Sequence, residues 1–283
     1  MSKKGIDVSV WNGNIDWSKA KDKIDFAILR VGYGSNLRNQ DDGTFKRNAD
    51  ACVKYGIPFG VYIYSYATNT AMAKSEAEHT LRLIKGYKLS YPVYLDLEDA
   101  GTTGKCSKST ILKMSKAFAS VIEDAGYTVG FYANTYWWTN KLTDSWYNGY
   151  SRWVAQYNSK CTYSGKYDIW QYTSTGKVSG VTGNNGNVDM NICYKDFGKK
   201  TEPSSKPSPK PASSTIKAGK KLSLKSVPLY ASATSSTKAT SVTGTYYLWN
   251  TEKVNSRYRI TNSTSNVGKS GQVTGWIDSK YVK

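Results

Sequence analysis

The chain of 283 residues contains a single histidine, His79, and this scarcity excludes several classes of enzyme. A zinc hydrolase usually binds its metal through more than one histidine, which this chain cannot supply. A Ser-His or Cys-His catalytic pair would have to use His79. The apolar periodicity of residues 74–84 predicts an amphipathic helix with His79 on its surface or edge. If the chain is an enzyme, carboxylates must therefore carry its acid–base chemistry.

Cysteine is also scarce, and its spacing argues against a metal or redox motif. Cys52, Cys106, Cys161 and Cys193 lie far apart in the sequence and never form Cys-x-x-Cys. This excludes a zinc knuckle and a thioredoxin-type site. We interpret all four as reduced, mostly buried thiols. The sequence thus predicts no metal and no cofactor.

Long apolar runs are missing as well. No run of about 18 apolar residues is present, so no transmembrane helix is expected. Residues 1–7 lack the apolar core of a signal peptide. We therefore expect synthesis in a cytoplasm, with any export by another route, and no membrane partner.

Acidic residues are few, and their deficit is concentrated at one end of the chain. The formal net charge is +18, from 39 basic and 21 acidic residues. Residues 1–198 hold 24 basic and 18 acidic residues, whereas residues 199–283 hold 15 and 3. Such a basic tail suits an anionic partner, and nucleic acid, anionic lipid and anionic cell-wall polymer all qualify. Simple solubility is the alternative explanation.

A change in composition predicts two domains. Residues 199–214 are rich in Pro, Ser and Lys and cannot build a core, which is typical of a semi-extended linker. We therefore predict a larger domain at 1–198 and a smaller one at 215–283.

Within residues 1–198, apolar β-prone runs alternate with helical periods, which predicts an α/β fold. The expected strands are residues 5–9, 26–31, 59–64, 92–96, 128–133, 152–157, 168–172 and 188–192. Eight strands with interleaved helices indicate a compact, TIM-like (β/α) barrel. The last strands leave little room for helices between them, so a distorted barrel is expected rather than a regular one.

One predicted strand becomes acidic at its C-terminal end. The run 91–99 begins with apolar residues and ends with three acids, of which Asp96 and Glu98 are two residues apart. Alternation along a strand places both side chains on one face, with Cβ atoms about 6.5–7 Å apart. Carboxyl pairs at about this separation cleave glycosidic bonds. A helix cap or a structural salt bridge is the alternative.

Other candidate site residues follow from their positions and chemistry. In barrels the chemistry lies at the C-terminal strand ends, where Asp7 and possibly Asp189 also fall. The chain has 23 tyrosines and 9 tryptophans, whose rings with a polar group suit carbohydrate clefts that are partly apolar and partly solvated. Candidate sugar contacts are Tyr62, Tyr64, Trp138 and Trp170, with core packing as an equal alternative.

Three segments resemble a known family. Gly5–Trp17 is similar to the opening of the family 25 glycoside hydrolases, the Chalaropsis-type lysozymes. Tyr94–Glu98 resembles their Asp-x-Glu motif, and Trp170–Tyr172 followed by Val188–Asn191 resembles their closing motif. The resemblance is ordered over residues 5–195. It implies a flattened, irregular barrel that cleaves the β-1,4 bond between N-acetylmuramic acid and N-acetylglucosamine in peptidoglycan.

The resemblance also implies roles for the acids. Glu98 is expected to be the general acid, with a pKa that nearby Asp96 helps to raise. Asp96 would orient and stabilise the 2-acetamido group of the substrate during attack on the anomeric carbon. The rival is inversion, with Asp7 or Asp189 activating water. Otherwise Asp7 and Asp189 would line the cleft, or serve in local turns.

The tail resembles a bacterial SH3-type wall-binding domain, in segments 231–234, 242–249, 257–261 and 275–278. Its short β runs also predict a small all-β barrel. Candidate wall contacts are Tyr246, Tyr247, Trp249 and Trp276.

The two resemblances together are similar to endolysins of phages that infect Gram-positive bacteria. Such a protein would stay in the host bacterial cytoplasm until a holin releases it to the wall. A bacterial autolysin and a non-catalytic wall-binding protein are alternatives. A nucleic-acid binder is disfavoured because the tail has no named nucleic-acid motif.

Overall fold

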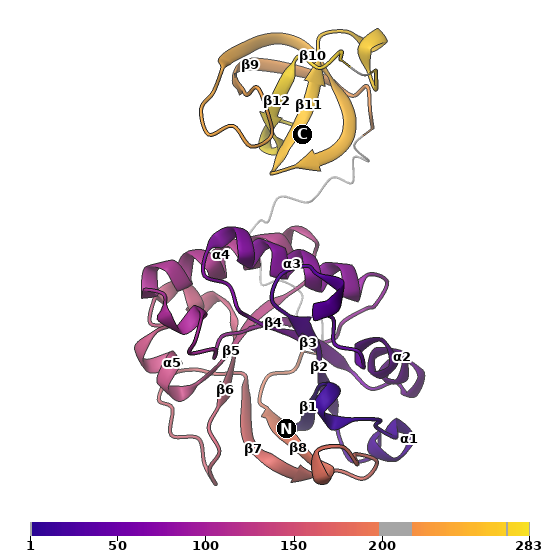
Figure 1. Cartoon of the computed structure of the whole chain (residues 1–283), viewed down its shortest axis with the longest axis vertical. Helices are drawn as coiled ribbons and strands as arrows, with labels where there is room; N and C mark the ends of the chain where they lie inside the picture. Colours follow the sequence, from indigo (N-terminus) through magenta and orange to yellow (C-terminus); the bar gives the residue numbers. More distant parts are fainter. Residues whose placement is uncertain (1, 198–216, 270, 283) are drawn as a thin grey trace. The chain divides into compact units, whose positions relative to one another are not determined.

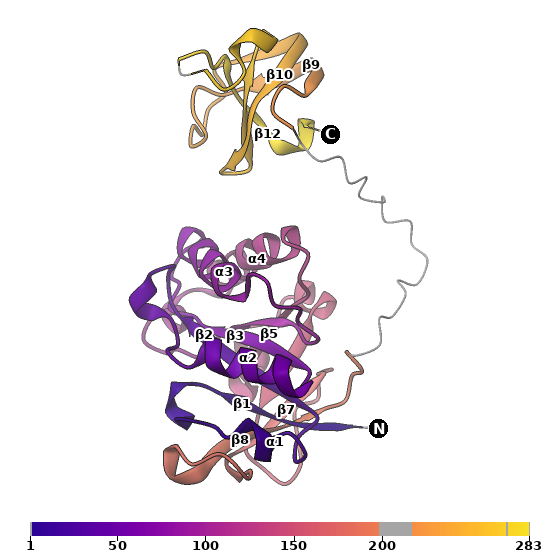
Figure 2. The same cartoon turned by 90° about the vertical axis from the view of Figure 1, so that its right-hand side faces the viewer.

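The computed structural model describes residues 2–197, 217–269 and 271–282. The chain divides into two compact units, Met1–Glu202 and Pro203–Lys283. Figures 1 and 2 show each unit from two directions. The predicted linker at 199–214 lies outside the described residues. Within the described ranges, no helix is both long and apolar enough to cross a membrane.

The N-terminal unit is a closed barrel of eight strands, and all eight predicted strands are present. In chain order they are β1 (Lys3–Val8), β2 (Phe26–Tyr33), β3 (Phe59–Tyr64), β4 (Val93–Asp96), β5 (Val129–Asn134), β6 (Ser151–Ala155), β7 (Ile169–Lys177) and β8 (Asn187–Cys193). Neighbouring strands from β1 to β7 pair in parallel.

The barrel closes irregularly, because β8 runs antiparallel to both β7 and β1. The connection between β7 and β8 contains only a short 3₁₀ turn, Asn184–Gly186. A parallel crossover needs a dozen or more residues, so this short connection forces an antiparallel return. The consequence for the site is a register in which Asp7 on β1 lies opposite Asp189 on β8.

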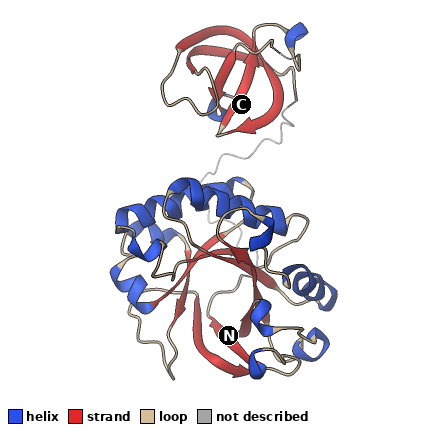
Figure 3. Ribbon diagram, viewed as in Figure 1, coloured by secondary structure: helices blue, strands red, loops and turns tan. Residues whose placement is uncertain are grey.

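Five α-helices accompany the strands: α1 (Trp17–Ala20), α2 (Phe45–Tyr55), α3 (Thr70–Ile84), α4 (Lys108–Asp124) and α5 (Thr135–Asn140). Helices α3 and α4 run side by side on the outside of the barrel (Figure 1). No α-helix lies between β7 and β8, where the one helical element is the 3₁₀ turn Asn184–Gly186 (Figure 3). The crowding expected for the last strands is therefore confirmed.

His79 is buried, so the prediction that it lies at the helix surface is wrong. Its ring is fully covered, with Nδ1 3.1 Å from the Gly34 carbonyl oxygen and Nε2 2.8 Å from Asp41 Oδ1. Arg82, one turn further along α3, also donates to Asp41. The segment that follows β2 thus covers a helix face that periodicity alone assigns to solvent.

Aromatic rings fill the barrel interior beneath its open end. The Trp153 ring packs 5.3 Å from that of Tyr94 and 4.5 Å from that of Tyr132, centroid to centroid. A Cβ atom at Gly130 would lie 2.3 Å from the Tyr94 ring, so only glycine leaves room for it. These rings form an apolar floor, and the polar side chains of the interior lie above it.

The C-terminal unit is a four-stranded antiparallel sheet in the order β12-β11-β10-β9. Its strands are β9 (Lys221–Leu229), β10 (Thr240–Val254), β11 (Arg257–Thr261) and β12 (Gly275–Asp278). Leu248 and Ile260 lie in its core, and Tyr246 packs against the same core. Alternation along β10 turns Tyr246 inward and Tyr247 and Trp249 outward. This favours packing for Tyr246 over the predicted wall contact.

We predict that the two units fold separately. Fragments 1–200 and 215–283 should each unfold cooperatively, because each unit has its own core. Each melting temperature should lie within roughly 5 °C of a transition of the whole chain, a shift that corresponds to about 1 kcal/mol. Calorimetry of both fragments and the whole chain is the measurement. A fragment without a cooperative transition would show that its unit depends on the other.

Candidate active site

Four carboxyl groups gather at one end of the barrel interior. Asp7 lies near the C-terminal end of β1, and Asp96 is the last residue of β4. Glu98 follows two residues later, and Asp189 comes from the antiparallel strand β8. Their charges act on one another: Asp189 and Glu98 both raise the pKa of Asp7, and Asp7 raises that of Asp96. The structure therefore brings together all four acids that the sequence singled out.

Asp7 and Asp189 form a hydrogen-bonded carboxyl pair. Asp7 Oδ2 also accepts hydrogen bonds from Gln171 Nε2 at 2.9 Å and Asn191 Nδ2 at 2.7 Å. Burial raises the pKa of Asp7 well above its ordinary value, and the charge of Asp189 raises it further. Burial also raises the pKa of Asp189, to about 6. Such a pair holds a proton between its members near neutral pH.

Asp96 is almost fully buried, with 3% of its surface exposed. Burial raises its pKa well above the ordinary value, the charge of Glu98 adds to this, and Arg30 opposes it. Its Oδ1 atom has no hydrogen-bond partner among the described residues. A buried carboxyl oxygen without a partner is rare in native proteins and calls for an explanation in function.

Glu98 is only partly buried and is the more accessible of the two motif acids. Burial raises its pKa, as does the charge of Asp189, while a hydrogen bond with Tyr132 lowers it. The upward direction agrees with the sequence-based expectation, but the negative charges that add to the effect of burial are those of Asp189 and Asp99 rather than that of Asp96. The physical reason is that burial favours the neutral form of Asp96, and a neutral carboxyl group adds no negative charge near Glu98.

Polar side chains that the sequence analysis did not assign hold this cluster in place. Tyr132 and Tyr157 place their hydroxyl groups 2.9 and 3.1 Å from Gln171 Oε1. Arg30 is held by Asp42, with Nε 2.8 Å from Oδ2. Strand alternation predicts that Gln171 shares a face with Ile169 in the barrel interior, which is the signal that could have found it.

The predicted sugar contacts divide into two groups. Tyr62 and Tyr64 lie beside the acids: the charge of Asp7 contributes to the raised pKa of Tyr62, and that of Glu98 to the raised pKa of Tyr64. Burial is the main cause of both shifts. The Tyr64 hydroxyl lies 3.5 Å from Asp99 Oδ2. Both tyrosines remain candidates for substrate contact.

Trp138 and Trp170 belong to the packing alternative. Trp138 is buried, its Nε1 donates to the Trp153 carbonyl oxygen, and the Arg152 guanidinium lies over its ring. Trp170 is also buried and donates to the Gln156 carbonyl oxygen. It points away from the acids because its strand neighbour Gln171 points toward them. The prediction that these two rings contact sugar is not supported by their placement.

Exposed aromatic side chains follow three barrel strands at the acidic end. Trp11, after β1, is 73% exposed, Tyr136, after β5, 62%, and Tyr157, after β6, 57%. Large exposed rings at the rim of a polar cleft suit the half-apolar faces of sugars. Trp11 lies within the segment Gly5–Trp17 that resembles the family's opening, and no sugar contact was predicted for it.

Glu76 on α3 anchors the segment that follows β3. It is fully buried and accepts hydrogen bonds from Ser65 Oγ and the Tyr66 backbone N–H, each at 2.8 Å. Thr103 donates from its hydroxyl to the Ala67 carbonyl oxygen at 2.9 Å, which ties the same segment to the chain beyond Glu98. Burial raises the pKa of Glu76 to about 7.

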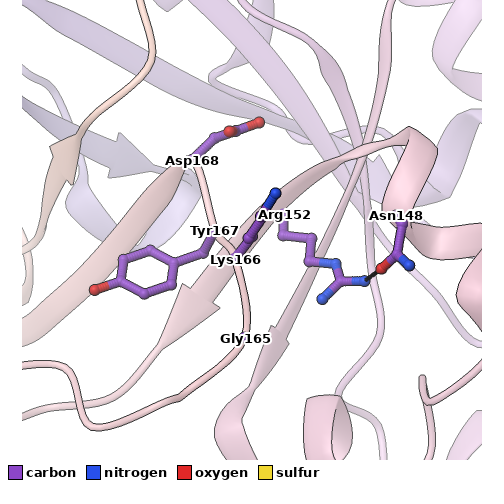
Figure 4. A pocket seen from close by; sticks show the side chains of 6 residues that line it. All are labelled: Asn148, Arg152, Gly165, Lys166, Tyr167 and Asp168. Carbon is purple, nitrogen blue, oxygen red and sulfur yellow. Dashed lines mark hydrogen bonds between the residues drawn. The ribbon is translucent and has the colours of Figure 1, made fainter.

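A cavity of about 360 Å³ lies at the other end of β6 and β7 (Figure 4). It is lined by Asn148, Arg152, Gly165, Lys166, Tyr167 and Asp168. Two of its charged side chains are already engaged: Arg152 donates to Asn148 and Tyr163, and Lys195 pairs with Asp168. It contains none of the four clustered acids, so we place the chemistry at the acidic end of the barrel.

Comparisons with known proteins point to one family. The family described as "Glycosyl hydrolases family 25" matches residues 6–181. Lysozyme M1 of Streptomyces globisporus is 29% identical over 204 residues, which cover 66% of this chain and 66% of that protein.

Solved structures agree with this match. The modular autolysin LytC from Streptococcus pneumoniae, in complex with a synthetic peptidoglycan ligand, is 33% identical with a TM-score of 0.60. That match covers 68% of this chain and 47% of LytC, so this chain spans about half the length of that relative. The catalytic domain of endolysin ply40 from bacteriophage P40 of Listeria monocytogenes is 26% identical, with a TM-score of 0.59 over 70% of this chain and 98% of that one.

We predict that Glu76 makes stability depend on pH. A carboxyl whose pKa is raised in the folded state favours folding at low pH, and this contribution is lost as pH rises through the folded pKa. Between about pH 4.5 and 7 the loss should reach roughly 3 kcal/mol, the equivalent of the shift from 4.5 to about 7. Denaturant unfolding of the wild type and Glu76→Gln across this range measures it, because the amide cannot titrate.

The control is Glu78→Gln, an exposed position on the same helix. The pH-dependent part of the difference from wild type should be large for Glu76→Gln and small for Glu78→Gln. Equal pH dependence in the wild type and Glu76→Gln would show that Glu76 does not titrate in this window.

Proposed function

The chain belongs to glycosyl hydrolase family 25, a family of glycoside hydrolases, and on this premise we propose that it is an N-acetylmuramidase. The bond cleaved would be the β-1,4 bond from N-acetylmuramic acid to N-acetylglucosamine in peptidoglycan. The observation that supports this best is the cluster of four carboxyl groups above an aromatic floor. Paired carboxyl groups with raised pKa values are what acid-catalysed glycoside cleavage requires.

Glu98 is the proposed general acid. Its raised pKa favours the protonated form that a general acid needs, and its partial exposure lets the carboxyl group reach the glycosidic oxygen of a bound glycan. Proton transfer from Glu98 to that oxygen accompanies breakage of the bond to the anomeric carbon. The carboxylate that remains then removes a proton from the water that completes hydrolysis.

Asp96 is the proposed partner of the 2-acetamido group. The amide N–H of that group would supply the hydrogen bond that Asp96 Oδ1 lacks among the described residues. A donor at this oxygen favours the ionised carboxylate, which stabilises positive charge as the acetamido oxygen attacks the anomeric carbon. Attack by the substrate's own oxygen retains the configuration after water opens the cyclic intermediate.

The inverting alternative receives less support from this geometry. It needs Asp7 or Asp189 to act as a base toward water. These two carboxyl groups are hydrogen-bonded to each other, and Asp7 also accepts from Gln171 and Asn191. Carboxyl oxygens that already take part in these hydrogen bonds are poorly placed to accept a proton from an attacking water. We therefore assign Asp7 and Asp189 to orientation of the site and to raising the pKa of Glu98.

For the biological setting we propose a phage endolysin. Similarity to the phage P40 endolysin supports it, while similarity to the autolysin LytC supports a bacterial autolysin as the second candidate. An endolysin would remain in the host cytoplasm until holin-type release. The C-terminal unit is proposed to be an SH3-type module that binds the wall. A non-catalytic role is disfavoured because all four acids of the cluster are present.

Glu98→Gln should abolish lysis without unfolding the protein. The amide keeps the shape of the side chain but cannot donate the proton, and loss of general acid catalysis lowers rates by about 10²–10⁴-fold. Turbidity clearing of peptidoglycan suspensions measures activity, and circular dichroism checks the fold. Glu78→Gln, the same change at an exposed position, should clear at the wild-type rate. Clearing by Glu98→Gln at that rate would contradict the assignment.

Asp96→Asn should be comparably damaging, because the amide cannot become the carboxylate that stabilises the acetamido group. A loss of about 10²-fold or more is expected.

Mass spectrometry of wild-type products provides a separate check of the bond: fragments with muramic acid at the reducing end are expected. Glucosamine at the reducing end would mean that the other glycosidic bond is cut.

Removal of divalent metals should leave activity intact. In the described ranges, no group of three or more His, Cys, Asp or Glu side chains is arranged to hold a metal ion. Carboxylate acid–base chemistry needs none. Lysis is measured after dialysis against EDTA, with and without added zinc. Activity that EDTA abolishes and zinc restores would refute the carboxylate mechanism.

A further inference from the structure

The C-terminal unit carries positive charge that it does not neutralise itself. Its described residues, 217–269 and 271–282, contain ten lysines and arginines but only two acids, Glu252 and Asp278. Each acid is paired with an arginine: Glu252 Oε2 lies 3.1 Å from Arg259 Nη1, and Asp278 Oδ1 lies 3.0 Å from Arg257 Nε. The eight lysines of these residues therefore have no acidic side chain left to pair with inside the unit.

The two arginines differ in how far their donors are used. Arg257 donates from Nε to Asp278 and from Nη1 to backbone carbonyl oxygens of the loop 232–235, and its guanidinium carbon lies 3.3 Å from the Tyr230 ring centroid. These contacts make Arg257 a structural residue that holds this loop. Arg259 makes a single ion pair, with Glu252, so most of its N–H groups have no partner among the described residues.

Arg259 lies in a row of aromatic rings on the outer face of the sheet. Its strand partner on β12 is Trp276, and its guanidinium carbon lies 4.7 Å from the Trp276 ring and 5.2 Å from the Trp249 ring. The Trp249 ring is held by a hydrogen bond from Nε1 to the Lys269 carbonyl oxygen at 3.1 Å. All three side chains are partly exposed. The result is a preformed platform with a cation flanked by two rings.

We propose that this platform, Trp249, Arg259 and Trp276, binds a phosphodiester-linked polymer of the bacterial wall. The proposal rests on the wall-directed function above and names the partner of the C-terminal unit. The free N–H groups of Arg259 match the paired oxygens of a phosphate. The tryptophan faces suit the C–H surfaces of sugars or polyols. The unpaired lysines add attraction along the ligand, which requires a charge that repeats along its length.

The repeated charge is what favours this ligand over the carboxylates of wall peptides. A single carboxylate would engage Arg259 but leave the lysines of the other strands without a partner. A polyanion with regularly spaced phosphates can contact Arg259 and these lysines at the same time, so its binding should be strong and sensitive to salt. Nucleic acid also has repeating phosphates, and the experiment separates it by competition.

The test is co-sedimentation with purified Gram-positive walls, using the whole chain in a Glu98→Gln background. One wall sample is untreated, and the other is stripped of phosphodiester polymers with hydrofluoric acid. Arg259→Gln removes the charge at the platform. Lys225→Gln is the matched control, because it removes one charge from an exposed position on β9. Lys225 lies beside the part of β10 that is about six residues, or roughly 20 Å, along the strand from Trp249.

On untreated walls, Arg259→Gln should weaken binding by about 10-fold or more, as loss of a central contact does, and Lys225→Gln by about twofold. Arg259→Lys should recover part of the loss, because it restores the charge without the paired donors. Stripped walls should bind the unchanged platform weakly and show no further loss with Arg259→Gln. Circular dichroism confirms that each variant is folded.

Three results would overturn the proposal. Equal binding of Arg259→Gln and Lys225→Gln would show that the platform does not bind the wall. Undiminished binding to stripped walls would exclude the phosphodiester ligand. Duplex DNA that displaces the protein from walls at equal phosphate concentration would identify a nucleic-acid site instead. Lysis of stripped walls by the chain with Glu98 intact, measured in parallel, reports the proposed activity independently. Failure of the muramidase therefore remains distinguishable from failure of the binding site.

Discussion

Four carboxyl groups confined to the open end of one barrel are the constraint on which the rest of the N-terminal unit depends. Buried carboxyl groups are destabilising unless they are neutral, paired or hydrogen-bonded. The fold meets this requirement in three ways: Asp7 and Asp189 are hydrogen-bonded to each other, amide groups of Gln171 and Asn191 donate to Asp7, and Arg30 faces Asp96. The raised pKa values that acid catalysis needs are a direct consequence of this crowding.

The irregular closure of the barrel makes this crowding possible. In a barrel of parallel strands alone, Asp7 would have a parallel neighbour with its own helical crossover. Antiparallel β8 instead brings Asp189 opposite Asp7 and sets Asn191 on the same face. Helices are lost at this side, but a second acid and an amide donor enter the site. The distortion is thus part of how the site is built.

The two units handle charge in opposite ways. The N-terminal unit concentrates acids inside a cleft, where each acid changes the pKa of neighbours that lie within a few ångströms. The C-terminal unit neutralises its two acids with arginines and leaves its lysines without acidic partners. Such exposed charge acts over about a Debye length and is weakened by salt. A cleft of carboxyl groups suits chemistry on a bond, whereas an exposed basic sheet suits attachment to an extended anionic ligand.

The sequence by itself determined the eight strands and the irregular end of the barrel. These depend on apolar runs, connection length and strand alternation, all of which are local. Only the tertiary structure decided that His79, Trp138 and Trp170 are buried, that Tyr246 packs inward, and that Arg259 lies between two tryptophans. It also decided that burial, together with the charges of Asp189 and Asp99, raises the pKa of Glu98. Burial and electrostatic neighbours come from segments far apart in the chain, and periodicity within one segment does not report them.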